Sequence, residues 1–370
     1  MQDFHFVRRG DYPGRNGGDG DWHVQTGAPS KWEQRWLDEP LTVSDGVADE
    51  ARERDLRYVE QGQTFAGPAF VVGLQNADVF GNFIVADQRG GILTDSFRAL
   101  GAVADAGFLH KEKELYTHEL DWTHQREGTF AVLGIQTNNN YFHWLLEACA
   151  RVQALEDAGL LRPDLLFVVP PLRPWMREIL NTLGVANRQM VEQSRDSRVR
   201  YQNLLVPARG LVNIRTFNEH AVRMARSLPK PAAGAAIKLF VSRQKSSSRH
   251  LGNEDEIFET AQALGYIKIF PEDLPFSEQM ALFARASHIA GPLGAGLTNA
   301  AFMREGGAMV EFAPEGRTGD ATLFANMAHN WSLRYRGVVG PFAGGGDRPA
   351  DRRNFTVNLA LAQDALHAVE

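Results

Sequence analysis

A glycine-rich segment late in the chain has the residue pattern of a phosphate-binding loop. In GPLGAGLTNAAF (291–302), three glycines precede Thr298 and Asn299. The segment follows a predicted strand, SHIAG, and opens a predicted helix, where backbone N–H groups and the helix dipole favour an anion. As a truncated G-x-G-x-x-G it is weak by itself, because a tight turn that needs glycine at positive φ gives the same pattern. The loop alone leaves both interpretations open.

A group of basic side chains follows another predicted strand. In VSRQKSSSRHLGNEDE (241–256), Arg243, Lys245 and Arg249 lie among serines directly after IKLFV. Ligands of open α/β sheets bind outside the carboxyl ends of the strands, and the glycine-rich segment is predicted at that same edge. Arginine and lysine can neutralise a diphosphate there without a metal. The alternative is a solvated basic turn.

Glu311 is expected at the end of the predicted strand AMVEFA, where its carboxylate could hydrogen-bond ribose hydroxyls. Dinucleotide dehydrogenases carry their glycine fingerprint after the first strand of the nucleotide domain. Here the first strand after the linker ends in SRQKSSSR, and the glycines follow a later one. This order argues against a dehydrogenase and for a nucleotide-sugar site.

Residues of acid–base type occur in the first half of the chain, in NNNYFHWLLE (138–147). On a helix over 141–158, His143, Glu147 and Arg151 would lie along one stripe at i, i+4 and i+8. A carboxylate one turn from a histidine fixes its tautomer and raises its basicity, as a general base requires. Spacing alone favours the structural alternatives, in which His143 is satisfied by backbone and Glu147–Arg151 is a plain helix ion pair.

Motifs for metal or nucleophilic catalysis are weak. Asp19-Gly-Asp21 is formally an acidic D-x-D, but it lies in a glycine-rich arm with no strand before it. The single cysteine, Cys149, excludes a thiolate zinc site and an intrachain disulfide. No G-x-S-x-G elbow is present. We therefore expect no metal in catalysis.

The elements that must position these residues alternate between short apolar strands and helices. Residues 66–95 contain apolar runs cut by glycine, typical of β-hairpins. The strands TFAVLGI, LLFVVP and NLLVPA then alternate with the helix over 141–158 and with PWMREILNTLG. After a linker, SLPKPAAGAA (227–236), regular alternation predicts a parallel sheet covered on both faces, with Asn253 as the N-cap of one helix.

The predicted organisation is two Rossmann-like domains facing across a cleft. An irregular arm spans residues 1–65, and the first domain, including the hairpins, spans 66–228. The second domain spans 229–345, and a C-terminal helix in 346–370 packs back on it.

The amino-acid composition limits the classes of protein to which this chain can belong. The chain has 370 residues, 44% of them hydrophobic, and a net charge of −6, so a sizeable core is expected and a nucleic-acid partner is not. The N-terminus lacks the apolar region of a signal peptide, and no run reaches the length of a membrane span. We expect a cytoplasmic protein without a transmembrane segment. Its oligomeric state is open, with a homodimer considered.

Four segments together resemble glycosyltransferase family 61. They are NNNYFHWLLE, FVSRQKSSSRHLGNEDEI, PEDLPFSEQMALFARASHIAGPLGAGLTNAAFM and MVEFAP, in the family's order and spacing over roughly residues 128–315. The combination is more specific than any one motif. The resemblance implies an α/β fold of the GT-B type with an N-terminal β-rich extension. It also implies an inverting, metal-independent transfer from a nucleotide sugar, usually UDP-linked, to an acceptor hydroxyl.

The resemblance also implies roles for particular positions in donor binding. Arg243 and Arg249, with Lys245 beside them, match the basic motif that holds the diphosphate. Glu272 and Leu274 match a segment that borders the base, and Glu311 matches the acidic residue of the last strand. The family's glycine-rich segment, which contacts phosphate or ribose, corresponds to Leu293, Gly294, Ala295, Gly296, Leu297, Thr298 and Asn299.

His143 and Glu147 match a family segment near the acceptor, which here includes Asn140 and Tyr141. The resemblance does not fix which of these residues is the base. One position departs from the family, which commonly has histidine where this chain has Leu293. That difference removes a hydrogen-bond donor or cation near the phosphates.

By analogy with bacterial-type members, the expected role is in capsular or other cell-surface polysaccharide assembly. The expected partners are a nucleotide-sugar donor and a glycan or other hydroxyl acceptor, with no cofactor. Two alternatives remain from other classes: a nucleotide-binding module that transfers nothing, and an NAD-dependent oxidoreductase.

Overall fold

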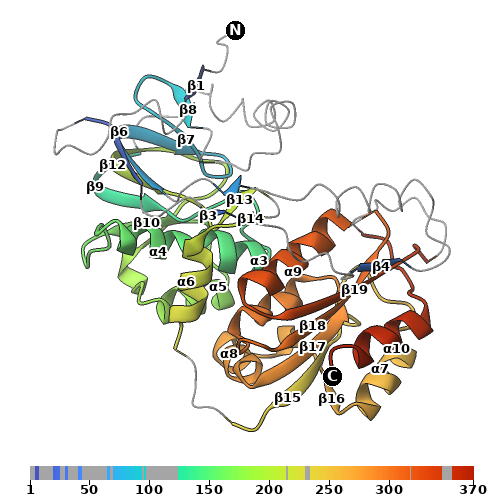
Figure 1. The fold of residues 1–370 in the computed structure, drawn as a ribbon. Coiled ribbons are helices and arrows are strands. Elements are labelled where there is room, and N and C mark those ends of the chain that lie inside the picture. The colour runs from blue at the N-terminus through green and yellow to red at the C-terminus, as the bar shows by residue number, and fades with distance from the viewer. Residues whose placement is uncertain are drawn as a thin grey trace. The chain divides into compact units, whose positions relative to one another are not determined.

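The computed structural model describes residues 5–7, 20–25, 30–31, 41–43, 65–66, 70–93, 96, 124–213, 216–229, 234–316, 318–343 and 352–370. The chain divides into two compact units (Figure 1). The first comprises residues 1–30, 66–213 and 218–228, and the second comprises residues 31–65, 214–217 and 229–370. Most of the arm expected over residues 1–65, including Asp19, lies outside the described residues.

The first unit is built on a mixed sheet. Its strands lie in the order β1 (His5–Val7), β8 (Gly91–Leu93), β7 (Ile84–Ala86), β6 (Phe70–Phe80), β12 (Arg198–Pro207), β9 (Gln125–Val132), β10 (Leu166–Val169) and β11 (Met190–Glu192), and β2 (Trp22–Gln25) also pairs with β6. The antiparallel pairs β6–β7 and β7–β8 confirm the expected hairpins. β12, β9, β10 and β11 pair in parallel, as does β1 with β8, so this sheet is mixed.

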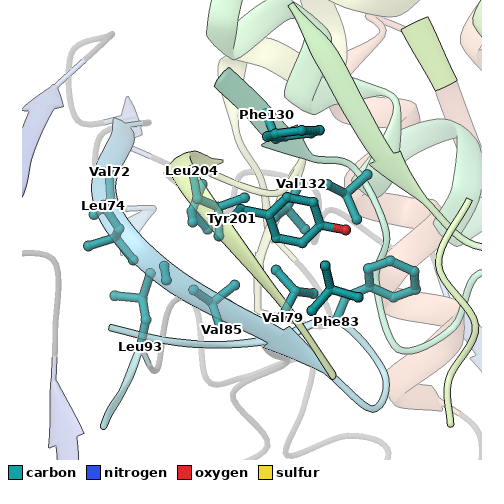
Figure 2. Packing of buried hydrophobic residues seen from close by; sticks show 14 of the residues in the cluster. Val72, Leu74, Val79, Phe83, Val85, Leu93, Phe130, Val132, Tyr201 and Leu204 are labelled. Atoms are coloured by element: carbon teal, nitrogen blue, oxygen red, sulfur yellow. The ribbon is translucent and has the colours of Figure 1, made fainter. Parts of the chain in front are cut away.

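The core of this sheet joins the hairpin strands to the parallel strands. Phe130 of β9 and Tyr201 of β12 have ring centroids 4.7 Å apart. Figure 2 shows these two rings among aliphatic side chains such as Val72 and Val132. The Tyr201 hydroxyl donates to Gln193 Oε1 at 2.8 Å, which satisfies the polar end of this buried ring.

The helix expected over 141–158 is present but interrupted by a π-helical turn. It consists of α3 (Tyr141–His143), the π-helical turn Trp144–Ala148 and α4 (Ala150–Asp157). The Cys149 N–H donates to Trp144 O at 2.9 Å, five residues back. Gly210 also contacts this segment, because its N–H donates to Glu147 O at 3.2 Å. A β-carbon at Gly210 would lie 1.6 Å from Leu146 O, so only glycine fits there.

The remaining helices of the first unit are α5 (Pro174–Thr182) and α6 (Glu219–Ser227). α5 begins with Pro174, as the sequence predicted, since proline suits the first helical position. α6 packs on α4 through His220 and Asp157, whose Nδ1 and Oδ2 atoms lie 2.7 Å apart.

The second unit contains the predicted parallel sheet and confirms the α/β class. Its strands lie in the order β16 (Tyr266–Ile269), β15 (Ile237–Val241), β17 (Ala286–Pro292), β18 (Ala308–Pro314), β19 (Arg334–Gly340) and β4 (Leu41–Val43), and every neighbouring pair is parallel. Along the chain, β15 leads to β16 through α7 (Glu254–Ala263) and β16 leads to β17 through α8 (Phe276–Ala284). β17 leads to β18 through the 3₁₀-helix Ala295–Phe302, and β18 leads to β19 through α9 (Thr318–Asn330).

Helices cover both faces of this sheet. α7 and α10 (Leu359–His367) pack together on one face, where Ile257 and Leu366 join the apolar cluster around Phe240 and Val310. α8 and α9 lie on the opposite side (Figure 1). A doubly covered parallel sheet explains why the central strand β18 is buried along its whole length.

Residues near the C-terminus are joined to the segment that precedes α7. Leu251 and Phe355 form a β-bridge, and the His250 N–H donates to Asn354 Oδ1 at 3.0 Å. Asn253 occupies the N-cap position of α7, but its side chain makes no capping hydrogen bond, so that prediction was wrong in its chemistry. Its amide instead donates to Val357 O at 2.8 Å and accepts from Val357 N at 3.3 Å.

The approach of Gly210 to the π-helical turn generates a prediction. Gly210→Ala should lower the free energy of unfolding by about 1–3 kcal/mol, because the new methyl overpacks against a backbone carbonyl that cannot move aside. Urea denaturation measures the change. Gly20→Ala is the control, since a β-carbon at Gly20 meets nothing within 4 Å. Equal stability of the two variants would contradict the contact.

Candidate functional site

The strand order of the second unit defines a switch point at its carboxyl edge. β15 comes first in the chain, and the strands that follow it lie on either side, β16 on one and β17 on the other. In open α/β sheets ligands bind where the strand order reverses in this way. The basic loop leaves β15 and the glycine-rich segment leaves β17, so the structure brings these two segments to the switch point.

The three glycines of the segment are needed for close approach to β15. A β-carbon at Gly291 would lie 2.4 Å from Val241 O, and one at Gly296 would lie 2.9 Å from Val241 Cγ1. A β-carbon at Gly294 would lie 1.9 Å from Arg243 Nη1. Gly294 has a φ of 177°, and none of the three is among the positive-φ glycines, so the alternative of a turn needing positive φ was wrong.

Arg243 is held against this glycine backbone. Its Nη2 donates to Ser248 O at 3.2 Å, and its Nε is buried without a partner among the described residues. Burial and the charge of nearby Arg249 lower the pKa of Arg243 to about 10, against the opposing effects of Glu272 and Glu254. Arg243 therefore stays charged at neutral pH and retains an N–H group that has no acceptor among the described residues.

Arg249 and Lys245 occupy different environments in the same loop. Arg249 has a φ of 58°, which is rare for a residue with a side chain and is typical of constrained functional loops. It lies within electrostatic reach of both Arg243 and Glu311. Lys245 is half exposed, forms an ion pair with Asp273, and has its Nζ 4.5 Å from the Phe270 ring centroid.

Glu272 and Leu274 lie around the short 3₁₀-helix Pro271–Asp273 that follows β16. Glu272 is exposed, and its charge acts on Arg243. Leu274 is half-buried, and its carbonyl accepts from Gln279 Nε2 at 2.9 Å.

The helix after the glycines buries most of its side chains. Leu293, Gly294, Leu297, Thr298 and Asn299 are buried, whereas Ala295 and Gly296 are half-buried. The Asn299 amide donates to Gln279 Oε1 at 2.9 Å, and Thr298 Oγ1 has no partner in the described part of the chain. Any ligand contact from this helix therefore comes first from the backbone of residues 295–296.

Glu311 lies in the middle of β18, where the sequence predicted the end of a strand. Its register partners are Gly291 of β17 and Gly337 of β19, and its side chain is completely buried. The Tyr335 hydroxyl donates to Glu311 Oε2 at 2.7 Å, and Oε1 has no partner among the described residues. Burial raises the pKa of Glu311 to about 8, against the opposing effects of Tyr335 and Arg249.

The first unit carries the second group of candidate residues, at the carboxyl ends of β9 and β12. His143 Nδ1 lies 2.6 Å from Glu147 Oε1, so the spacing correctly predicted this contact. Glu147 is buried, and its Oε2 lies 3.8 Å from Nη1 of Arg209, which follows β12. His143 keeps 14% of its side chain exposed, so this dyad is open to solvent on the histidine side.

Arg151 lies on the same helix but makes different contacts. It is fully buried, and its Nη1 donates to Val132 O at 3.1 Å and to Gly134 O at 2.8 Å. Burial and the charge of Arg209 lower the pKa of Arg151 to about 9, while Glu147 opposes this shift. Arg151 thus holds the end of β9 through two hydrogen bonds, and its positive charge interacts with the Glu147 carboxylate.

Asn140 and Tyr141 begin this helix. The Asn140 side chain is its N-cap and accepts from the Phe142 N–H at 3.0 Å. The Tyr141 ring centroid lies 5.9 Å from that of Trp175. Both residues are at least partly exposed beside His143.

Comparison with known protein families tests the resemblance that these residues carry. A family model described as Glycosyltransferase 61 matches residues 141–310. Residues 141–310 are similar to glycosyltransferase family 61. The match includes the His143–Glu147 pair, the basic loop and the glycine-rich segment, and it supports glycosyltransferase activity. A comparison with curated proteins found no match.

Three residues in or near the matched segment 141–310 were not predicted from the sequence. Arg209 follows the apolar run NLLVP as Arg243 follows IKLFV, and this position after a strand was the available signal. Glu254 accepts from Ser242 and is buried, and Tyr335 is the partner of Glu311. Their roles depend on contacts between distant segments.

The described ranges contain no group of three or more His, Cys, Asp or Glu side chains arranged to hold a metal ion. Within the same ranges, no helix combines the length and the apolar character that a membrane crossing needs.

The burial of Glu311 predicts a pH-dependent stability. Its folded-state pKa of about 8 exceeds the usual 4.5, so the folded protein binds more protons between these values and its free energy of unfolding falls as pH rises through them. Glu311→Gln keeps an acceptor for Tyr335 and removes this loss. The variant should gain at least about 1.4 kcal/mol over wild type between pH 5 and 8, the equivalent of one pKa unit.

Urea denaturation at several pH values measures this difference. Glu259→Gln, which changes an exposed carboxylate of α7, should follow the wild-type profile. A Glu311→Gln profile parallel to wild type across the whole range would show that the carboxyl titrates normally.

Proposed function

We propose that this chain is an inverting, metal-independent glycosyltransferase that moves a sugar from a UDP-sugar to an acceptor hydroxyl. The observation that carries the proposal is Arg243 packed on the Gly294 backbone at the switch point of a parallel sheet. A charged guanidinium at this position, with a buried N–H that has no acceptor in the described part of the chain, suits the diphosphate of a nucleotide sugar.

In this proposal the second unit holds the donor. Arg243 and Arg249 bind the diphosphate, the half-buried backbone of Ala295 and Gly296 contributes N–H groups, and Glu272 and Leu274 border the base. As the glycosidic bond breaks, negative charge grows on the leaving diphosphate. Two positioned guanidinium groups stabilise that charge, which is the task a divalent cation performs elsewhere.

The first unit supplies the base. With Glu147 ionised and accepting, His143 Nδ1 carries the proton and donates to it, so Nε2 retains its lone pair. The acceptor hydroxyl gives its proton to Nε2 as its oxygen attacks the anomeric carbon on the side opposite the diphosphate. One displacement inverts that carbon and needs one base, with no covalent enzyme intermediate. Asn140 and Tyr141, partly exposed beside His143, contact the acceptor.

By family analogy, this reaction serves the assembly of a capsular or other cell-surface polysaccharide in the cytoplasm. Glu311 is assigned no ribose contact here, because its carboxyl is buried inside the sheet and already accepts from Tyr335.

Two substitutions should separate donor binding from proton transfer. Arg243→Ala removes a charge-assisted hydrogen bond worth about 1.5–3 kcal/mol and should raise the donor KM about 10- to 100-fold. His143→Ala removes the base and should lower kcat by about 10²–10⁴-fold with little change in donor KM. UDP release from a panel of nucleotide sugars, with acceptors, measures both.

Arg352→Ala and His367→Ala remove the same side-chain types from exposed positions and are the controls. Wild-type turnover in both Arg243→Ala and His143→Ala would remove the proposal. UDP binding without transfer to any acceptor would instead indicate a nucleotide-binding module.

Metal independence is tested separately. Turnover should be unchanged by excess EDTA, because arginines supply the counter-charge. Activity that EDTA abolishes and Mn²⁺ restores would refute this part of the proposal and leave the donor assignment intact.

A further inference from the structure

Glu254, the first residue of α7, is a buried carboxylate joined to the start of the basic loop. The Ser242 hydroxyl donates to Glu254 Oε1 at 2.5 Å, and the Arg243 N–H approaches Oε2 at 3.4 Å. Both Glu254 and Ser242 are only 2% exposed. A single side chain of α7 therefore holds the two residues at which the chain leaves β15.

The same contacts extend to the next residue of the loop. Ser242 Oγ accepts from the Gln244 N–H at 3.2 Å, while its own proton goes to Glu254. Ser242 N also donates to Ile269 O at 3.0 Å, which ties the turn to β16. Three consecutive residues, 242–244, are thus fixed by one hydroxyl and one carboxylate.

Glu254 also interacts with charged groups around it. Burial raises the pKa of Glu254, and the hydrogen bonds from Ser242 and Arg243 and the charge of Lys268, whose Nζ lies 3.8 Å from Oε1, oppose that rise. The α7 N-terminus also favours a negative charge there. Glu254 acts in turn on the Arg243 guanidinium and opposes the lowering of its pKa by burial. The carboxylate therefore stabilises both the backbone of Arg243 and the charge of its side chain.

We infer that Glu254, acting through Ser242, is a positioning residue that holds the Arg243 guanidinium for the donor diphosphate. The inference rests on the proposed function for its consequence in donor binding. Glu254 itself is not placed against the donor, because it is buried beneath the loop.

Glu254→Gln is the matched test, because it keeps an oxygen for Ser242 and removes the charge. The variant should bind UDP at least about tenfold more weakly in titration calorimetry and raise the donor KM by the same factor. Acceptor KM should stay within twofold of wild type, since the acceptor residues lie in the other unit. Trypsin should also cleave the variant faster after Arg243, Lys245 or Arg249, because the loop loses its anchor.

Glu256→Gln is the control, since Glu256 is an exposed carboxylate in the same first turn of α7. Thermal denaturation identifies variants that fail to fold. If the Glu254→Gln variant does not fold, Ser242→Ala is the second test, because it removes the same hydrogen bond without changing a charge. It should weaken UDP binding and speed tryptic cleavage as well.

The inference would be overturned if the Glu254→Gln and Glu256→Gln variants had the same UDP affinity and the same rate of tryptic cleavage. A parallel rise in donor and acceptor KM, which indicates a general structural defect, would also overturn it. If wild type neither binds UDP nor releases it from a nucleotide sugar, the proposed function fails instead. In that case the rate of tryptic cleavage still decides whether Glu254 positions the loop.

Discussion

The chain leaving β17 must pass within van der Waals distance of the chain leaving β15, and the rest of the candidate donor site depends on this contact. Val241 O, Val241 Cγ1 and Arg243 Nη1 occupy the space where β-carbons of Gly291, Gly296 and Gly294 would lie. The contact packs the partly buried Arg243 guanidinium against the Gly294 backbone. A guanidinium that is already desolvated and oriented loses less entropy when an anion binds.

A similar arrangement recurs in the first unit. An arginine follows β12, and Gly210 after it lets the chain approach the π-helical turn that carries Glu147. The extra residue of a π-helical turn changes which side chains face the strand ends, and such turns are frequent at functional sites. In both units, an arginine that follows a strand lies near a glycine at which a β-carbon would clash with neighbouring atoms.

The sequence predicted the elements well, because apolar periodicity and Gly/Pro punctuation are local signals. It placed the hairpins of β6–β8, the parallel strands β15–β18 and the His143–Glu147 contact correctly. It failed where partners are distant in the chain: Asn253 bonds Val357, and Glu311 lies inside the sheet against Tyr335. Arg209 and Glu254 went unrecognised for the same reason, since a buried carboxylate or guanidinium is identified only by what surrounds it.

Residues 354–357 contact residues 250–253, the segment before α7, and this contact determines how short a functional fragment could be. Asn354, Phe355 and Val357 supply hydrogen-bond partners and apolar cover to residues 250–253, which immediately follow the basic loop. The segment 352–370 lies beyond the family match, yet it packs against residues 250–253 and α7. A chain shortened to the matched region would leave backbone groups unsatisfied beside Arg249, so the boundary of sequence similarity here is narrower than the boundary of the folding unit.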